Sequence, residues 1–147
     1  MIVGNEAEMH ALGAMLAQRA EPGDVIALRG ELGVGKTTLA RGLLSALGLE
    51  EEAPSPSFAI VQPYAPPLVR YPVAHIDLYR IEDAGEIQEL ALDELVLDSL
   101  LLIEWPEKMG DALWPHSLVL KIEAIDDGSR RLTATVPAAW KERWPLK

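Results

Sequence analysis

The sequence predicts an α/β fold of three layers, with a mixed sheet that carries antiparallel hairpins. Three observations predict it. A short apolar run at 25–29 is followed by a glycine-rich loop and then by a helical apolar stripe. A second apolar run at 100–103 ends on a carboxylate, which is typical of a buried parallel strand that leads into a site. Two further pairs of strand-like segments are joined by short turns, which only antiparallel strands can use.

The glycine-rich loop at 30–37, GELGVGKT, has the pattern of a phosphate-binding loop between a strand and a helix. Gly33 and Gly35 add no Cβ and tolerate positive φ, so the backbone N–H groups can curl around a polyphosphate. Lys36 is placed to reach the β- and γ-phosphates, and the Thr37 hydroxyl to ligate Mg²⁺, at the positive end of the next helix. We therefore expect one P-loop NTPase-like domain over 1–147. The expected nucleotide-binding residues are Glu31, Leu32, Gly33, Val34, Gly35, Lys36, Thr37 and Thr38.

The segment before the loop predicts a helix and then a buried strand. Asn5 and Glu8 have the spacing of a capping box, and an apolar stripe continues from them to about Arg19. The breaker sequence EPGD at 21–24 ends that helix. The short, apolar run at 25–29 then forms the strand that leads into the phosphate loop.

The segment after the loop predicts a helix, a loop and a hairpin. The helix runs from Lys36 to about Leu47, and Gly48 is placed to end it as a left-handed cap. Residues 50–56 contain two prolines and cannot form a helix or a central strand. Strands at 57–64 and 68–79 are joined by a short turn and are expected to pair antiparallel.

The last third of the chain predicts a helix at 83–97, a buried parallel strand at 100–104 and a second hairpin. The helix starts with another capping-box pattern, Asp83 with Glu86. The hairpin pairs 116–125 with 130–136 across the turn DDGS. The tail with Trp140 and Trp144 has no pattern that assigns it to an element.

Two acids are candidates to complete a nucleotide site. Glu104 stands at the end of the apolar strand, in the position of a Walker B acid that holds Mg²⁺. Asp98 is the alternative, but the apolar residues before it continue a helical pattern. Asp77 lies on the polar face of a predicted strand beside His75, where it is either a ligand or an edge residue that keeps the strand soluble. We expect catalytic roles for Lys36, Asp77 and Glu104, and metal ligands among Thr37, Asp77 and Glu104.

Two further features have a functional and a structural interpretation. Ser55 and Ser57, in SPSF at 55–58, follow the P-loop helix, where a γ-phosphate-sensing switch is usual, although the segment also suits a plain turn. Trp105 follows Glu104 and precedes a proline, so its backbone is expected to be extended. Its ring is either a site aromatic or part of the core.

Composition restricts the classes of partner. Lys and Arg number 13 and Asp and Glu 23, giving a formal charge of −10, which weighs against a surface that binds nucleic acid directly. The chain has no cysteine, which excludes disulfides and thiolate metal sites. No apolar segment approaches the roughly 20 residues of a membrane span. We expect a cytoplasmic protein without membrane contact that acts through protein partners.

Four motifs together resemble the TsaE (YjeE-type) family of bacterial P-loop ATPases. They are GELGVGKTT at 30–38, SPSF at 55–58, HIDLYR at 75–80 and EWPE at 104–107. The resemblance covers about residues 5–125. It implies a Mg²⁺-dependent ATPase that acts with TsaB and TsaD in attaching a threonylcarbamoyl group to adenosine 37 of ANN-decoding tRNAs, with tRNA contacted only indirectly. It also implies that Asp77 and Glu104 are the acids of the site, 55–58 the switch, and Trp105 an aromatic near it.

The chain departs from the family pattern at two positions. Ser57 stands where the family often has Thr and keeps the hydroxyl, whereas Val34 stands where a small residue is common and stiffens the loop. Two other function classes stay open: a nucleotide-gated interaction protein, in which binding rather than hydrolysis matters, and a small-molecule kinase. A kinase usually has an arginine-rich lid, which the spacing of Arg70, Arg80, Arg130, Arg131 and Arg143 does not provide. GTP is disfavoured because no Asn-Lys-x-Asp segment occurs.

Overall fold

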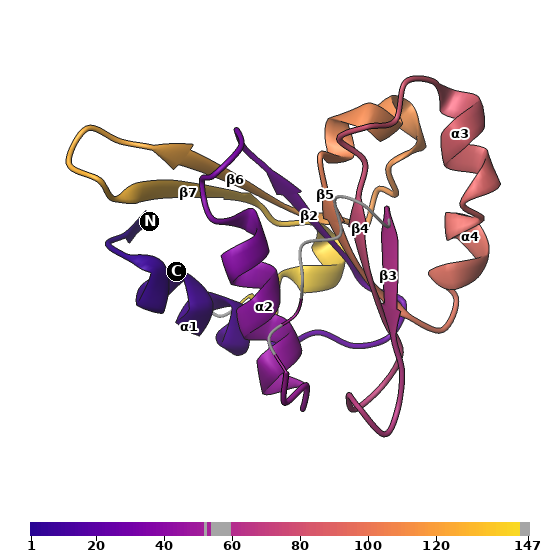
Figure 1. Cartoon of the computed structure of the whole chain (residues 1–147), viewed down its shortest axis with the longest axis horizontal. Helices are drawn as coiled ribbons and strands as arrows, with labels where there is room; N and C mark the ends of the chain where they lie inside the picture. Colours follow the sequence, from indigo (N-terminus) through magenta and orange to yellow (C-terminus); the bar gives the residue numbers. More distant parts are fainter. Residues whose placement is uncertain (52, 54–59, 145–147) are drawn as a thin grey trace.

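The structure, a computed structural model, describes residues 1–51, 53 and 60–144. Within these ranges a seven-stranded sheet has the order β1-β7-β6-β2-β5-β4-β3, with helices on both faces (Figure 1). The strands are β1 (Ile2–Val3), β2 (Val25–Arg29), β3 (Val61–Tyr64), β4 (Val73–Asp77), β5 (Leu100–Glu104), β6 (Leu118–Ala124) and β7 (Arg130–Thr135). The helices are α1 (Glu6–Ala17), α2 (Lys36–Ala46), α3 (Ala84–Glu89) and α4 (Leu92–Leu95), with 3₁₀ helices η1 (Pro106–Ala112) and η2 (Ala138–Trp140). None of them is long and apolar enough to cross a membrane.

The centre of the sheet is parallel and its edges are antiparallel. Strands β6, β2, β5 and β4 run in one direction, while β3 pairs antiparallel with β4, and β7 pairs antiparallel with β6. Both predicted hairpins are therefore confirmed. The register sets Leu28 of β2 opposite Glu104 of β5, and Glu104 opposite Asp77 of β4. Three strands thus end at the same edge of the sheet, directly beside the glycine-rich loop that follows β2.

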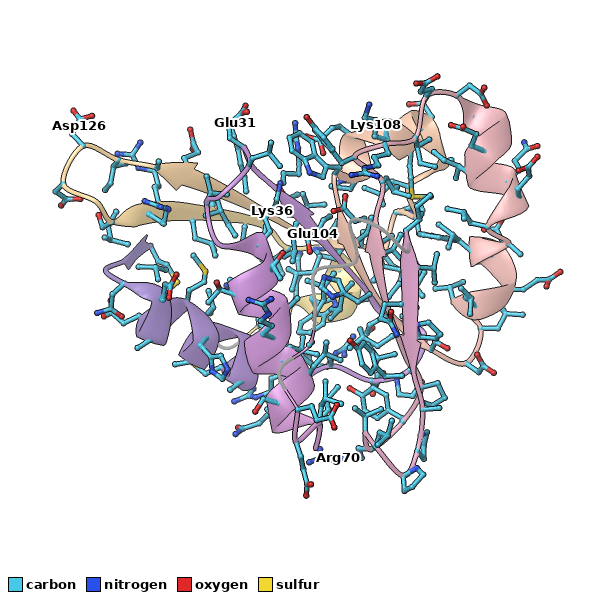
Figure 2. The ribbon with its side chains drawn as sticks, in the orientation of Figure 1. Glu31, Lys36, Arg70, Glu104, Lys108 and Asp126 are labelled. Carbon is cyan, nitrogen blue, oxygen red and sulfur yellow. The ribbon has the colours of Figure 1, made fainter. Side chains whose placement is uncertain are left out.

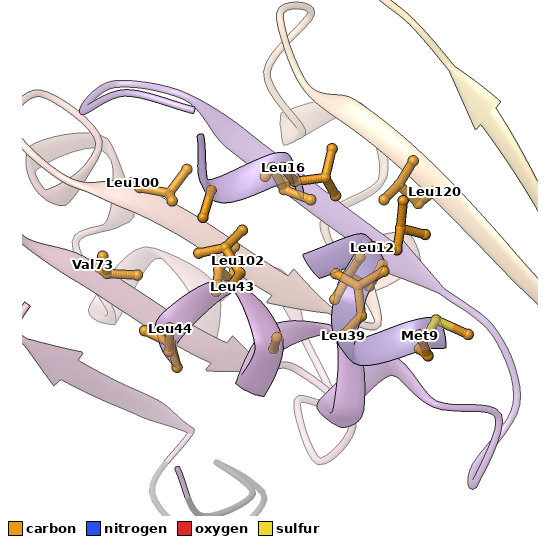
Figure 3. Packing of buried hydrophobic residues seen from close by; sticks show 14 of the residues in the cluster. Met9, Leu12, Leu16, Leu39, Leu43, Leu44, Val73, Leu100, Leu102 and Leu120 are labelled. Atoms are coloured by element: carbon orange, nitrogen blue, oxygen red, sulfur yellow. The ribbon is translucent and has the colours of Figure 1, made fainter. Parts of the chain in front are cut away.

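Two apolar clusters fill the space on the two faces of the sheet, and alternate residues of each strand face opposite clusters. Leu100 and Leu102 of β5 pack with α1 and α2, whereas Leu101 and Ile103 pack with α3 and α4. Figure 3 shows the first cluster, where leucines of α2 meet Leu102 and Val73 of the sheet. The mixed, three-layer α/β fold predicted from the sequence is confirmed, because apolar residues occupy both faces of the central strands.

Helices α1 and α2 approach each other closely because each contributes a glycine at the contact. A Cβ added to Gly13 would lie 2.1 Å from the Leu39 carbonyl oxygen, and one added to Gly42 would lie 2.0 Å from the His10 carbonyl oxygen. Real Cβ atoms do not approach a backbone oxygen so closely, so neither position accepts a side chain without separating the helices. The contact fixes α2, whose first turn carries Lys36 and Thr37.

The N-terminal caps and the C-terminal glycine that the sequence predicts for the helices are confirmed. Asn5 Oδ1 accepts the Glu8 N–H at 2.9 Å, and Asp83 with Glu86 forms a complete capping box. Gly48 has a φ of 117° after α2, as the left-handed cap requires.

The second strand of the first hairpin is shorter than predicted. It covers Val73–Asp77 rather than 68–79, and residues 66–71 form turns and bends. Pro72 cannot donate to a ladder, so the strand begins after it. The strand ends where the Asp77 side chain accepts the Tyr79 N–H at 2.9 Å and turns the chain. Of the first strand, predicted at 57–64, β3 covers 61–64, Ile60 lies in a bend, and 57–59 lie outside the described residues.

The predicted helix at 83–97 is wrong as one helix, because it is broken into α3 and α4 at Ala91, whose φ is 53°. Ile87 and Leu92 are both buried against the sheet. Five residues apart on one continuous helix, they would lie about 140° apart, so the break lets both face the core.

Two features had no sequence signal: the two-residue β1, which pairs with β7, and the complete burial of Trp140.

The close approach of α1 and α2 predicts that Gly42→Ala destabilises the protein. Alanine in a helix interior is normally better than glycine by about 0.5–1 kcal/mol, but here the methyl group meets backbone. We expect the free energy of unfolding to fall by about 1–3 kcal/mol, measured by urea denaturation. The matched control is Gly85→Ala, where the nearest atom is the Asp83 carboxylate at 3.2 Å, and we expect a change within about 0.5 kcal/mol. A Gly42→Ala protein as stable as the wild type would contradict the packing argument.

Candidate functional site

A pocket of about 410 Å³ lies at the carboxyl ends of β2, β4 and β5, against the first turn of α2. Its volume is in the range of small-molecule sites, roughly 300–1,000 Å³. Figure 2 labels Lys36 and Glu104, which both lie at this edge of the sheet, whereas Arg70 lies at the opposite end of the molecule. The pocket is lined by Val3, Asn5, Glu6, Met9, Leu32, Gly33, Val34, Gly35, Lys36, Thr37, Thr38, Asp77, Glu104, Trp105, Gly128 and Arg130.

The glycine-rich loop has the strand-loop-helix context that its sequence predicts. Gly33 and Gly35 have φ values of 78° and 113°, which favour glycine, and α2 begins at Lys36. Of the eight predicted nucleotide-binding residues, seven line the pocket. Glu31 does not line it and is exposed.

Val34 is part of the apolar core as well as of the loop. Its side chain is only 5% exposed and belongs to the cluster beneath α1 and α2. One of its methyl groups would lie 2.7 Å from a Cβ on Gly30, so Gly30 must be a glycine for this valine to fit. Leu32, two residues earlier in the same loop, is 66% exposed.

The Lys36 ammonium is buried among groups that also line the pocket. It donates a hydrogen bond to the Gly30 carbonyl and lies 3.8 Å from the centre of the Trp105 ring, in a cation–π contact. Burial lowers the pKa of Lys36, and the nearby carboxylates of Glu104 and Asp77 oppose that shift. The Lys36 side chain thus lies inside the glycine-rich loop, where the sequence predicts that it binds phosphate.

Glu104 is a buried carboxylate with two hydrogen-bond partners from different elements. Thr37 Oγ1 lies 3.3 and 3.2 Å from its two oxygens, and His75 Nε2 lies 2.7 Å from Oε2. An ionised carboxylate can only accept, so His75 Nε2 carries the hydrogen and donates it. His75 is completely buried, and its Nδ1 has no hydrogen-bond partner within the described ranges. The prediction from sequence did not identify this contact between His75 and Glu104.

Asp77 and Trp105 complete the wall of the pocket. Asp77 is 6% exposed and ends β4 opposite Glu104. Trp105 has a φ of 62°, so the predicted extended backbone is wrong. The chain must turn sharply from β5 into η1, where Pro106 takes the first helical position. That turn brings the Trp105 ring to 5.0 Å from the Tyr79 ring and over Lys36, so Trp105 lies at the pocket.

Asp98, the alternative acid, does not join this group. Asp98 precedes β5 and accepts a hydrogen bond from Ser99 Oγ. The five residues of β5, about 15 Å, separate Asp98 from the edge of the sheet where the strand ends at Glu104. The predicted switch residues Ser55 and Ser57 lie outside the described residues.

Arg130 also lines the pocket, although the sequence indicated only that it does not belong to an arginine-rich lid. It comes from the start of β7, and its Nε donates to the Val34 carbonyl at 3.1 Å, across 96 residues of chain. The pocket also extends to Asn5 and Glu6 at the start of α1 and to Gly128 in the β6–β7 turn. No local pattern indicated these residues, because they are far from the loop in the sequence and come close to it only in the folded protein, where β7 pairs with β6 and β6 with β2.

The donor set fits a magnesium ion that is completed by water and phosphate oxygens. Adjacent ligands of an octahedral Mg²⁺ lie about 3 Å apart, and Thr37 Oγ1 lies 3.2 Å from a Glu104 oxygen. Among residues 1–51, 53 and 60–144, no group of three or more His, Asp or Glu side chains is arranged to hold a metal ion without other ligands. Such a site is typical of Mg²⁺, which keeps several waters and binds through one or two protein groups and substrate phosphates.

A comparison with known families decides the assignment. The sequence profile of the family described as "Threonylcarbamoyl adenosine biosynthesis protein TsaE" matches residues 3–132. The chain belongs to the TsaE family. The resemblance carried by the four sequence motifs is therefore confirmed.

Individual TsaE relatives match most of the chain. A Streptomyces coelicolor protein named "tRNA threonylcarbamoyladenosine biosynthesis protein TsaE" is 36% identical over 143 residues, which cover 92% of this chain and 93% of the relative. A Bacillus subtilis protein of the same name is 36% identical over 132 residues, covering 89% and 81%. The crystal structure of YdiB from Bacillus subtilis superimposes with a TM-score of 0.80 at 29% identity, covering 97% of this chain and 87% of that one.

The burial of Val34 predicts a stability effect inside the loop of this TsaE-family protein. Val34→Ala removes buried methyl groups and should lower the free energy of unfolding by about 1–2 kcal/mol in urea denaturation. Leu32→Ala is the matched control in the same loop, and its exposed side chain should change stability by less than about 0.5 kcal/mol. Equal effects of the two substitutions would show that Val34 is not a core residue.

Proposed function

We propose that this chain binds and hydrolyses ATP with Mg²⁺ and so supports threonylcarbamoyl transfer to adenosine 37 of ANN-decoding tRNAs, together with TsaB and TsaD. The observation that carries the ATPase part is the contact between Thr37 and Glu104 at 3.2–3.3 Å. It joins the first turn of the P-loop helix to the acid at the end of β5, which is the arrangement a P-loop ATPase needs on the metal side of its nucleotide. The pathway part rests on the names of the TsaE relatives.

The residues of the pocket have separate roles in this proposal. The N–H groups of the loop and the first turn of α2 bind the phosphates, and Lys36 moves from the Gly30 carbonyl to the β- and γ-phosphate oxygens. Thr37 and Glu104 would hold Mg²⁺, which neutralises charge on the phosphates when it is bound. Asp77 lies on the neighbouring strand end and would orient the attacking water directly or through a second water.

The partner part of the proposal is supported by charge. With a formal charge of −10, the chain has little means of releasing counterions from an RNA backbone, which is the usual source of affinity for nucleic acid. Lys36 and Arg130, the cations that line the pocket in the described part of the chain, contact carbonyl groups of the loop itself. We therefore assign tRNA contact to TsaB and TsaD rather than to this chain.

Substitutions of Lys36 and Glu104 test the ATPase assignment with different expected outcomes. Lys36→Ala removes a charge-assisted hydrogen bond to phosphate and should weaken ATP binding at least about tenfold, measured by calorimetry. Glu104→Gln keeps the size of the side chain but removes the negative charge that would hold Mg²⁺, so it should leave ATP bound and lower phosphate release about 100-fold or more. The matched control is Glu107→Gln, three residues further on, whose side chain is 40% exposed and lies 3.6 Å from Arg29; it should stay within about twofold of wild type.

Wild-type binding and hydrolysis in both the Lys36→Ala and the Glu104→Gln proteins would overturn the assignment of the site. Loss of binding in both would place Glu104 in nucleotide binding rather than in hydrolysis.

A reconstituted modification reaction tests the pathway assignment. With TsaB, TsaD and tRNA present, threonylcarbamoyladenosine should accumulate over many rounds only when this chain and ATP are both added. Glu104→Gln should limit the yield to about one round, because hydrolysis resets the assembly. If a non-hydrolysable ATP analogue supported repeated rounds as well as ATP did, nucleotide binding alone would be sufficient and the hydrolytic role would be wrong.

A further inference from the structure

The Arg130 side chain connects the β6–β7 turn to the phosphate loop. On the turn side, Nη1 donates to the carbonyls of Gly128 and Ser129 at 3.1 and 3.2 Å. On the loop side, Nε donates to the Val34 carbonyl at 3.1 Å, and Nη2 lies 3.5 Å from the Gly33 carbonyl. The planar fork of a guanidinium is suited to such a bridge, because its five N–H groups point in fixed directions.

The orientation of two loop carbonyls determines the orientation of two loop amides. In a trans peptide, the C=O of one residue and the N–H of the next point in opposite directions. Because the Gly33 and Val34 carbonyls face Arg130, the N–H groups of Val34 and Gly35 face away from it. An anion bound in a P-loop is held by such successive N–H groups. Arg130 therefore stabilises the peptide orientation that the phosphates require.

The β6–β7 turn that Arg130 contacts is stabilised by its own hydrogen bonds. The Asp127 carboxylate accepts hydrogen bonds from the backbone N–H of Ser129 at 2.9 Å and from its hydroxyl at 2.5 Å. These bonds lower the pKa of Asp127, because they favour its ionised form. On the turn side, Arg130 is thus held by a segment that has side-chain hydrogen bonds of its own.

We propose that Arg130 is a positioning residue for nucleotide binding, which pre-organises the phosphate loop by holding the Gly33 and Val34 carbonyls on its outer side. The role rests on the proposed function, since it concerns the same nucleotide site. Arg130 acts through the loop backbone, and its effect is on the affinity for the polyphosphate rather than for the base.

The experiment compares three variants with two ligands. Arg130→Met removes the bridge, Arg130→Lys keeps the charge but cannot donate to both the turn and the loop, and Arg131→Met removes the neighbouring exposed arginine of β7. Each protein is titrated calorimetrically with ADP and with inorganic tripolyphosphate, which has no base or ribose, in the presence of MgCl₂ and far below its melting temperature. We expect Arg130→Met and Arg130→Lys to weaken both ligands by about tenfold or more, and Arg131→Met to change neither by more than about twofold.

Several results would overturn the inference. Wild-type affinity in Arg130→Met would show that the bridge does not matter, and wild-type affinity in Arg130→Lys would assign the effect to charge alone. Weakening of ADP but not of tripolyphosphate would place Arg130 at the base or ribose. If the wild-type protein bound neither ligand, the proposed function would fail and the inference with it, a result distinct from binding that is insensitive to Arg130.

Discussion

The burial of the Glu104 carboxylate is the constraint on which the site depends. Glu104 is 3% exposed, and removing a carboxylate from water costs several kcal/mol unless hydrogen bonds and charges compensate. The compensation comes from His75 on β4, from Thr37 on α2 and from the Lys36 ammonium. Because these groups come from different elements, the carboxylate is stabilised only when the parallel strands and the P-loop helix are correctly placed.

The pairing of β4 with β5 is consequently specified by polar as well as apolar side chains. His75, Asp77 and Glu104 point to the face covered by α1 and α2, and Ile76 and Ile103 point to the other. A slip of one residue would move His75 to the apolar layer of α3 and α4 and remove its hydrogen bond to Glu104. The same register that completes the core therefore assembles the site.

Features of the fold that depend on residues close together in the sequence were predicted correctly. The glycine-rich loop, the helix caps, the turns of the hairpins and the position of Glu104 at the end of a buried strand follow from local patterns, since each is decided within about ten residues. The contacts of His75 and Arg130 could not be predicted, because they join residues 29 and 96 positions apart and depend on the strand order. The break at Ala91 and the positive φ of Trp105 were also missed, because in both cases tertiary packing overrides the local preference.

The phosphate loop is held from two sides by different forces, and Val34 takes part in both. The Val34 side chain is buried in the core, where the hydrophobic effect stabilises it independently of salt. The Val34 carbonyl accepts a hydrogen bond from the partly exposed Arg130, and salt weakens interactions of such an exposed charge. A smaller residue at this position would keep the carbonyl contact but lose the apolar anchor. With the Val34 side chain buried in the core and its carbonyl bonded to Arg130, the N–H of Gly35 points away from Arg130. A valine in place of a small residue therefore stiffens the loop in the conformation that the proposed phosphate binding uses, rather than opposing it.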